Sequence, residues 1–290
     1  MKNSSPQLIT IHRAASPGAK SIFCFPGAGD SVTSFLSLAE CLGSSYTIFG
    51  IQARGLDGTS APDSSVEQAV LHNIDAVRMA NRGGPYLLLG HSFGGWIAFE
   101  MARQLAAGGA PLDTVVLLDT DPPDVVDGVL PRKARLDVLM DLIRNLEDKA
   151  AQPLYMSRAQ LADASHDHQL VLLMNAMKKI GLFARAASVQ TITRMLEVFE
   201  ANLNTRYAPL TPLAGDILLI YPMSPQPLVA DETGNRAIPA APVGDALAFS
   251  AWQSRAARAT RVEVAGTHMS MLASPGVARV AENIRQIWGP

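Results

Sequence analysis

A serine framed by glycines is the most informative feature of the sequence. Residues 86–95 read Tyr-Leu-Leu-Leu-Gly-His-Ser-Phe-Gly-Gly, so an apolar run enters a Gly-x-Ser-x-Gly motif and a helix-like segment follows. A strand, a sharp turn and a helix in this order are the context in which such a serine acts as a nucleophile. The glycines leave room in the crowded turn, and the start of the helix favours developing negative charge. We therefore predict that Ser92 is a nucleophile.

A serine hydroxyl is a weak nucleophile at neutral pH and needs an adjacent base. Of the six histidines, His268 has the fitting position, because it follows the last strand-like run and precedes the final helix-like run. Its loop is expected at the same sheet edge as Ser92. His166 and His168 lie close in sequence, but no further side chains with ligand spacing accompany them, so no metal site is predicted.

The base in turn needs an acid that fixes its tautomer and stabilises the imidazolium ion. The expected order along the chain is serine, acid, histidine. Asp119 ends the strand-like run after the nucleophile helix, and Asp121 is its local competitor. Alternatively, the acid follows the next strand, where the first acidic residue is Asp231. Asp119 is the favoured candidate.

Two backbone N–H groups are expected to stabilise the oxyanion that forms when a serine attacks a carbonyl. The geometry of the turn assigns one of them to Phe93. The loop Phe-Pro-Gly-Ala-Gly at residues 25–29 is predicted to supply the other, from Ala28. The same loop would also serve as an ordinary glycine turn, and the two interpretations are compatible.

These residues need a scaffold, and the sequence predicts a mostly parallel α/β sheet. Continuous apolar runs of this kind are typical of parallel strands covered on both faces. The strand-like runs are Leu8–His12, Ser21–Phe25, Tyr46–Ile51, Tyr86–Gly90, Thr114–Asp119, Asp216–Tyr221 and Thr260–Val264. Helix-like runs between or after them are Val32–Leu42, Val66–Ala80, Phe93–Ala107 and Pro275–Trp288. The first two strand-like runs are predicted to form an antiparallel edge hairpin.

The alternation stops between Pro122 and Pro212, where the pattern is helical only. Apolar residues there recur at helical spacing in three segments, Arg132–Lys149, His168–Ile180 and Val189–Asn204. We therefore predict a core formed by residues 1–122 and 213–290, with residues 123–212 inserted as a helical unit above the carboxyl edge of the sheet.

Composition limits the classes of function. The 290 residues are 48% hydrophobic and 17% charged, with a net charge of −2, which excludes an intrinsically disordered chain. The balance of charge argues against nucleic acid or an anionic membrane as the main partner. The amino-terminal residues lack the apolar core of a secretory signal, and the chain has only two cysteines. A cytoplasmic location is therefore expected.

Taken together, four segments resemble the thioesterase family of polyketide synthases and nonribosomal peptide synthetases. They are Phe-Pro-Gly-Ala-Gly at 25–29, Gly-His-Ser-Phe-Gly-Gly at 90–95, Leu-Leu-Asp-Thr-Asp-Pro-Pro at 117–123 and Gly-Thr-His-Met-Ser-Met-Leu at 266–272. The resemblance implies an α/β-hydrolase fold, with Ser92, Asp119 and His268 as a catalytic triad. It also implies that Ala28 and Phe93 form the oxyanion hole.

The resemblance further implies a substrate and a partner. An acyl or peptidyl chain would arrive as a thioester on the phosphopantetheine arm of a carrier protein, with no cofactor bound to the enzyme. The inserted helices would then form a lid over the acyl chain, and Met177 and Leu196 are predicted to contact it. Release would occur by hydrolysis or by macrocyclisation.

Two features refine this interpretation within the family. Chain-terminating members place the acid where Asp119 stands, whereas editing (type II) members more often place it one strand later. The chain lacks the leading helical hairpin through which polyketide-type domains dimerise, so a monomer is expected, and its start at Met1 would also suit a free-standing protein. A free-standing editing thioesterase and a general carboxylesterase of the same fold are the alternatives. A catalytically silent binding module is disfavoured by the complete triad.

Overall fold

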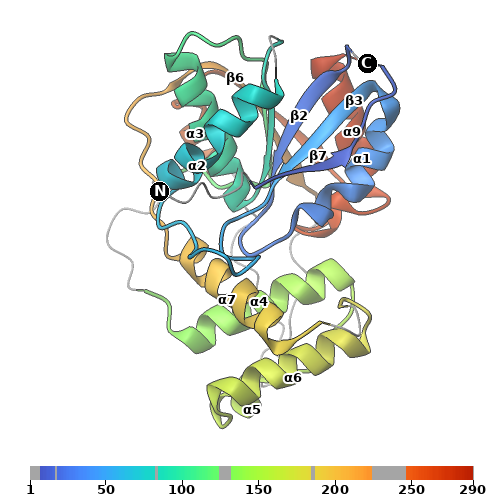
Figure 1. Cartoon of the computed structure of the whole chain (residues 1–290), viewed down its shortest axis with the longest axis vertical. Helices are drawn as coiled ribbons and strands as arrows, with labels where there is room; N and C mark the ends of the chain where they lie inside the picture. The colour runs from blue at the N-terminus through green and yellow to red at the C-terminus, as the bar shows by residue number, and fades with distance from the viewer. Residues whose placement is uncertain are drawn as a thin grey trace.

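The structure of the chain is a computed structural model. It describes residues 7–16, 18–81, 84–123, 132–183, 187–223 and 246–289. A mostly parallel sheet forms one layer, and a group of helices lies beyond one edge of it (Figure 1).

In the described part of the chain, seven strands form one sheet in the order β1-β3-β2-β4-β5-β6-β7. All neighbouring strands are parallel except β1 and β3. The mostly parallel α/β architecture predicted from the sequence is therefore confirmed. The strands are β1 Leu8–His12, β2 Lys20–Phe25, β3 Tyr46–Ile51, β4 Leu87–His91, β5 Val115–Leu118, β6 Leu213–Pro222 and β7 Ala256–Val264.

The predicted edge hairpin of the first two strands is wrong. β1 pairs antiparallel with β3, and Leu8 lies opposite Ile51. β2 has β3 and β4 as its parallel neighbours. Because both sides of β2 are occupied, β1 can add only at the outer side of β3, two positions away from the strand that follows it in sequence.

Helices cover both faces of the sheet, because side chains of successive strand residues point to opposite faces. Leu87 and Leu89 of β4 lie in one core cluster, whereas Leu88 lies in the other.

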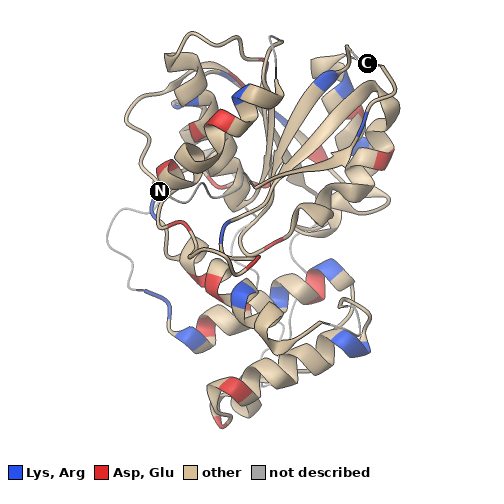
Figure 2. Cartoon of the chain, viewed as in Figure 1, with Lys and Arg blue, Asp and Glu red and all other residues tan. Residues whose placement is uncertain are grey.

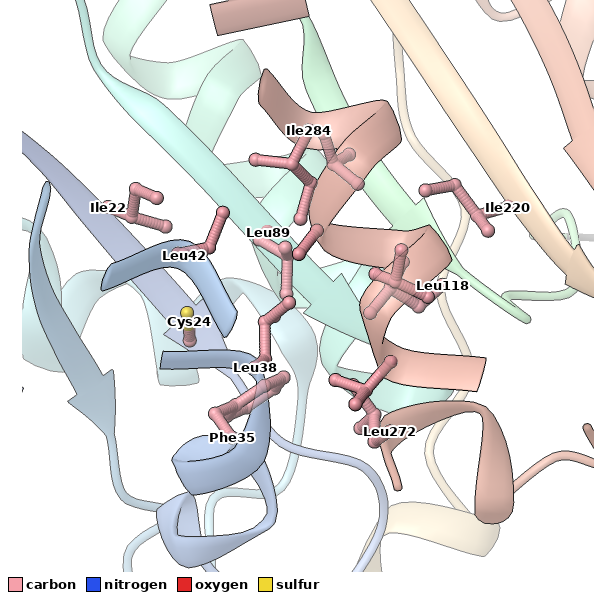
Figure 3. Packing of buried hydrophobic residues seen from close by; sticks show 14 of the residues in the cluster. Ile22, Cys24, Phe35, Leu38, Leu42, Leu89, Leu118, Ile220, Leu272 and Ile284 are labelled. Atoms are coloured by element: carbon pink, nitrogen blue, oxygen red, sulfur yellow. The ribbon is translucent and has the colours of Figure 1, made fainter. Parts of the chain in front are cut away.

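The first cluster includes α1 (Leu36–Leu42) and α9 (Gly276–Trp288), and Figure 3 shows Leu38 and Ile284 of these helices against Leu89 and Leu118. The second cluster includes α2 (Val66–Ala80), α3 (Phe93–Ala107) and Trp252 of α8 (Ala246–Gln253). Short 3₁₀ turns lie at Val32–Phe35, Gly43–Ser45 and Ser270–Leu272, and the first and third of them contribute buried residues to the first cluster.

Four further helices in the described ranges form the group beyond the sheet, here called the lid helices. They are α4 (Arg135–Ala150), α5 (Arg158–Ala162), α6 (His166–Lys179) and α7 (Val189–Leu203). Their apolar faces form a third core cluster that is separate from the two clusters of the sheet. Basic and acidic residues are interspersed over the sheet layer and the lid helices in the view of Figure 2. None of the helices in the described ranges is long and apolar enough to cross a membrane.

Candidate active site

Ser92 stands on a sharp turn between β4 and α3. Its backbone has φ 54° and ψ −126°, a conformation that L residues adopt only when the surrounding structure imposes it. A Cβ atom on Gly90 would lie 2.2 Å from the Gly94 carbonyl oxygen, and one on Gly94 would lie 2.1 Å from the Phe25 carbonyl oxygen. Glycines at these positions therefore allow the turn that presents Ser92 above the sheet.

The end of β5 is tied to this turn. The Ser92 N–H donates to the Leu118 carbonyl at 2.8 Å, and the Thr120 hydroxyl donates to the carbonyls of Ser92 and Leu118, at 3.2 Å in each case. A Cβ atom on Gly95 would lie 2.1 Å from the Thr120 hydroxyl oxygen, so the helix and the strand end approach closely. These contacts place Asp119, between Leu118 and Thr120, beside the turn that carries Ser92.

Asp119 and His268 form a close pair. His268 Nδ1 lies 2.6 Å from Asp119 Oδ2, and the Asp119 side chain is only 5% exposed. Asp119 has φ 42°, a region that a short polar side chain tolerates better than most. Its N–H donates to the Ile220 carbonyl at 2.8 Å, which anchors it to β6. Because the carboxylate accepts from Nδ1–H, the other imidazole nitrogen, Nε2, is left as the basic one.

The surroundings of His268 favour its protonated form. Burial acts to lower its pKa, but the hydrogen bond to Asp119 and the charges of Asp119, Asp148 and Asp121 together outweigh burial and raise the pKa. The carboxylates therefore stabilise the imidazolium ion that forms when His268 accepts a proton.

His91, the residue before Ser92, binds the backbone of the loop that contains His268. Its Nε2–H donates to the His268 carbonyl at 2.8 Å, and the two imidazole rings lie 4.7 Å apart. Burial, followed by the charge of His268, lowers the pKa of His91 to about 4. The ring is therefore neutral at pH 7. From the sequence, His91 was only the variable residue of the glycine-serine motif, and no local signal indicated this contact.

The competing acids have different environments. Burial and the charge of Asp119 raise the pKa of Asp121, although His268 acts to lower it. No hydrogen bond joins the Asp121 carboxylate to His268 in the described part of the chain. Asp231 and most of the proline-rich stretch around it lie outside the described residues.

The loop after β2 brings Ala28 to the site. Gly29 has φ 62°, and its N–H donates to Asn202 Oδ1 of α7 at 3.2 Å. No described residue accepts a hydrogen bond from the Ala28 N–H. Phe93 is the first residue of α3, where N–H groups have no partner within the helix. Both N–H groups are therefore available to a substrate oxygen.

A cavity that is open to solvent lies at these residues. Ser92, His268 and Ala28 line it from the side of the sheet, and the lid helices α4 and α7 form the opposite wall. The apolar lid residues in this wall are Leu142, Leu146, Met195, Phe199 and Leu203.

The structure does not bring Met177 and Leu196 to this cavity. They are 2% and 1% exposed and lie inside the core cluster of the lid helices. Met195, the neighbour of Leu196, lines the cavity instead. Helical periodicity identifies the apolar face of α7. It does not show which residues of that face pack against the other lid helices and which face the sheet edge.

The last turn of α4 contacts two loops of the site, the one that contains His268 and the one that contains Ala28. Asp148 accepts hydrogen bonds from the Thr267 hydroxyl and, at 2.9 Å, from the Met269 N–H. Lys149 Nζ donates to Asp30 Oδ1 at 2.6 Å. These contacts join residues 119 and 121 positions apart in sequence, so no local motif could have indicated them.

In the described ranges, no group of three or more His, Cys, Asp or Glu side chains could hold a metal ion. Cys24 is buried, and burial raises the pKa of its thiol well above the usual range. It is therefore an inert part of the core.

Comparison with protein families matches residues 20–288 to the model described as Thioesterase domain. Among curated proteins, Indigoidine synthase of Dickeya dadantii (strain 3937) is 34% identical over 119 residues, which are 40% of this chain and 8% of that protein. The matched segment is thus less than a tenth of that relative.

Two solved structures share the fold. The four-domain nonribosomal peptide synthetase AB3403 aligns with a TM-score of 0.79 and 23% identity, over 98% of this chain and 20% of that chain. The Vlm2 thioesterase domain aligns with a TM-score of 0.67 and 24% identity, over 96% of each chain. The α/β-hydrolase fold expected from the sequence is confirmed.

Proposed function

This chain belongs to the thioesterase domain family, which makes it a hydrolase, and we propose that it releases acyl chains from carrier-bound thioesters through a covalent intermediate on Ser92. The observation that carries the proposal is the Asp119–His268 pair, 2.6 Å apart, beside a cavity that Ser92 and His268 both line. A nucleophile, a base and an acid that orients the base are the parts that acyl transfer requires.

In the first step, Ser92 Oγ attacks the thioester carbonyl while His268 Nε2 takes the hydroxyl proton. Asp119 holds the imidazole through Nδ1 and stabilises its positive charge. The carbonyl oxygen becomes an oxyanion, to which Ala28 and Phe93 donate their N–H groups. Each such donor contributes on the order of 3 kcal/mol of transition-state stabilisation in related sites.

The intermediate then collapses and the C–S bond breaks. The thiolate of the carrier arm leaves with the proton held by His268, and the acyl group stays on Ser92 as an ester. In the second step, water, or a hydroxyl or amine of the acyl chain, attacks the ester carbonyl while His268 takes its proton. The C–O bond to Ser92 then breaks, and His268 returns the proton to Ser92 Oγ. Attack by water yields a linear acid, and attack by a group of the acyl chain yields a ring.

We infer that the acyl chain occupies the cavity between the sheet edge and the lid helices. Its lid wall is apolar at Leu142, Met195 and Phe199, and Met and Leu side chains adapt to varied acyl shapes. A carrier-bound substrate fits the relatives, whose names are those of synthases and synthetases. Asp119 directly follows β5, where chain-terminating members of the family place the acid, and this position favours chain termination over editing.

Intact-protein mass spectrometry with octanoyl-N-acetylcysteamine, a small thioester, tests the proposal. The wild type is expected to gain one octanoyl group, and Ser92→Ala to gain none. Ser254→Ala is the matched control, because this serine lies on the surface at the end of α8, and it is expected to behave as the wild type. An adduct on the Ser92→Ala variant, or on another residue of the wild type, would contradict the assignment. Rapid turnover of short oxygen esters with no preference for thioesters would favour a carboxylesterase.

A further inference from the structure

The loop that carries His268 is held from above by a residue of the lid. Asp148 lies in the last turn of α4 and is 8% exposed. One of its carboxylate oxygens accepts from the Thr267 hydroxyl, and the other accepts from the Met269 N–H at 2.9 Å. Thr267 and Met269 are the two neighbours of His268 in the chain, so a single carboxylate grips the loop on both sides of the histidine.

The arrangement leaves His268 fixed at three points from three elements. Asp119 binds the ring at Nδ1, His91 of β4 donates to the His268 carbonyl, and Asp148 of α4 holds the flanking residues. The first two partners belong to the sheet, whereas the third belongs to the lid helices. The position of the ring therefore depends on where α4 lies.

The next residue along α4 binds the opposite loop of the site. Lys149 Nζ donates to Asp30 Oδ1 at 2.6 Å and to the Ser34 hydroxyl oxygen at 2.8 Å. Asp30 directly follows the turn that contains Ala28. Two consecutive lid residues of opposite charge thus reach the loop that contains His268 and the loop that contains Ala28, here called the oxyanion loop. Both contacts form only when the last turn of α4 lies against the sheet edge.

We propose that Asp148 is a positioning residue for His268, through which docking of the lid helix α4 completes the catalytic base. The proposal rests on the function proposed above, in which His268 is that base. Asp148 does not line the cavity itself, so it acts on the base and not on the substrate. Its effect is therefore expected in the maximal rate of acylation, with little change in the substrate concentration that gives half of that rate.

Two substitutions separate the hydrogen bonds of Asp148 from its charge. Asp148→Ala removes both acceptors, and the rate of octanoyl transfer to Ser92 is expected to fall about tenfold to a hundredfold, as for other small misplacements of a catalytic group. Asp148→Asn keeps an oxygen for the Met269 N–H and places an amide beside the Thr267 hydroxyl. Most of the rate at high pH is therefore expected to return.

The pH profile distinguishes positioning from a general structural role. The charged and titratable groups near His268 are Asp119, Asp121, His91 and Asp148, with Asp30 and Lys149 across the cavity. Removing the negative charge of Asp148 makes the imidazolium less stable and lowers the pKa of His268. Since the neutral imidazole is the base, the acidic limb of the rate profile is expected to move to lower pH in Asp148→Asn.

Three further variants serve as controls. Asp137→Asn changes a half-exposed carboxylate on the same helix, paired with Arg158 at 2.6 Å, and is expected to leave the rate unchanged. Lys149→Met releases α4 from the oxyanion loop, and its acidic limb is not expected to move to lower pH. Thr267→Val removes one bond from the loop side and leaves α4 intact, so a slower rate in this folded variant supports the proposal if Asp148→Ala proves unstable.

The outcomes separate this inference from the proposed function. If Asp148→Ala, folded by circular dichroism, acylates as fast as Asp137→Asn, Asp148 does not position the base. The same conclusion follows if Asp148→Asn neither recovers the rate nor shifts the acidic limb. His268→Ala is measured in parallel, and rapid acylation in that variant would overturn the proposed function itself.

Discussion

Replacing the Asp119 carboxylate by a carboxamide tests the acid of the triad with little change in shape. Asp119 has φ 42°, a conformation that Asn tolerates as readily as Asp, so Asp119→Asn is expected to fold. The amide leaves His268 Nδ1 with a neutral partner. If the amide nitrogen faces the ring, it donates to Nδ1 and forces the proton onto Nε2, the atom that must accept from Ser92.

The magnitude follows from burial and distance. The Asp119 side chain is 5% exposed, and Oδ2 lies 2.6 Å from Nδ1, so water does not screen the interaction with the imidazolium ion. Loss of the carboxylate in a comparable triad lowers kcat by about 10⁴-fold. At about 1.4 kcal/mol for each factor of ten, this is roughly 5 kcal/mol of transition-state stabilisation.

The assay is the rate of octanoyl transfer to Ser92, measured by quenched-flow mass spectrometry. Asp121→Asn is the matched control, since Asp121 acts on His268 through its charge alone, and it is expected to cost less than tenfold, or under about 1.4 kcal/mol. Equal losses in the two variants would refute the assignment of Asp119. A minor loss in Asp119→Asn, with a large loss in Asp231→Asn, would move the acid to the later strand and favour the editing thioesterase.

Three further predictions follow from the same geometry. Acylation is expected to fall as pH decreases through the pKa of His268, and because this pKa is raised, the acidic limb of a pH–rate profile should lie above the usual histidine value of about 6.5. A limb below that value would contradict the pairing of His268 with Asp119. Met195→Gln, on the lid wall of the cavity, is expected to leave the rate of acylation nearly unchanged and, if the native product is cyclic, to raise the share of linear acid. An equal loss of acylation and of product release would show instead that Met195 binds the substrate. Gly94→Ala would place Cβ 2.1 Å from the Phe25 carbonyl oxygen, so urea denaturation should show a loss of stability of about 1–3 kcal/mol or more, whereas Gly18→Ala, with open space around its Cβ, should show little change.

Much of the candidate site could be predicted because its parts are local or follow chain order. The Gly-x-Ser-x-Gly motif and the runs beside it are contiguous in sequence, although only the crowding at Gly90 comes from the turn itself, since a Cβ on Gly94 would meet the carbonyl of Phe25. Asp119 and His268 directly follow apolar strands, and the carboxyl ends of parallel strands meet at one edge of a sheet. The structure brings these two side chains to 2.6 Å. Their catalytic roles remain predictions.

Other features depended on which surfaces meet in space, and the sequence does not encode these in any short segment. β1 pairs with β3 and not with β2, because the neighbours of β2 already occupy both of its edges. Met195 lines the cavity while Leu196 lies in the lid core, since that outcome depends on the rotation of α7 against its neighbours. Asp148 meets the His268 loop only because α4 docks on the sheet edge. A pattern of apolar residues determines that a face is buried, and only tertiary packing decides what it is buried against.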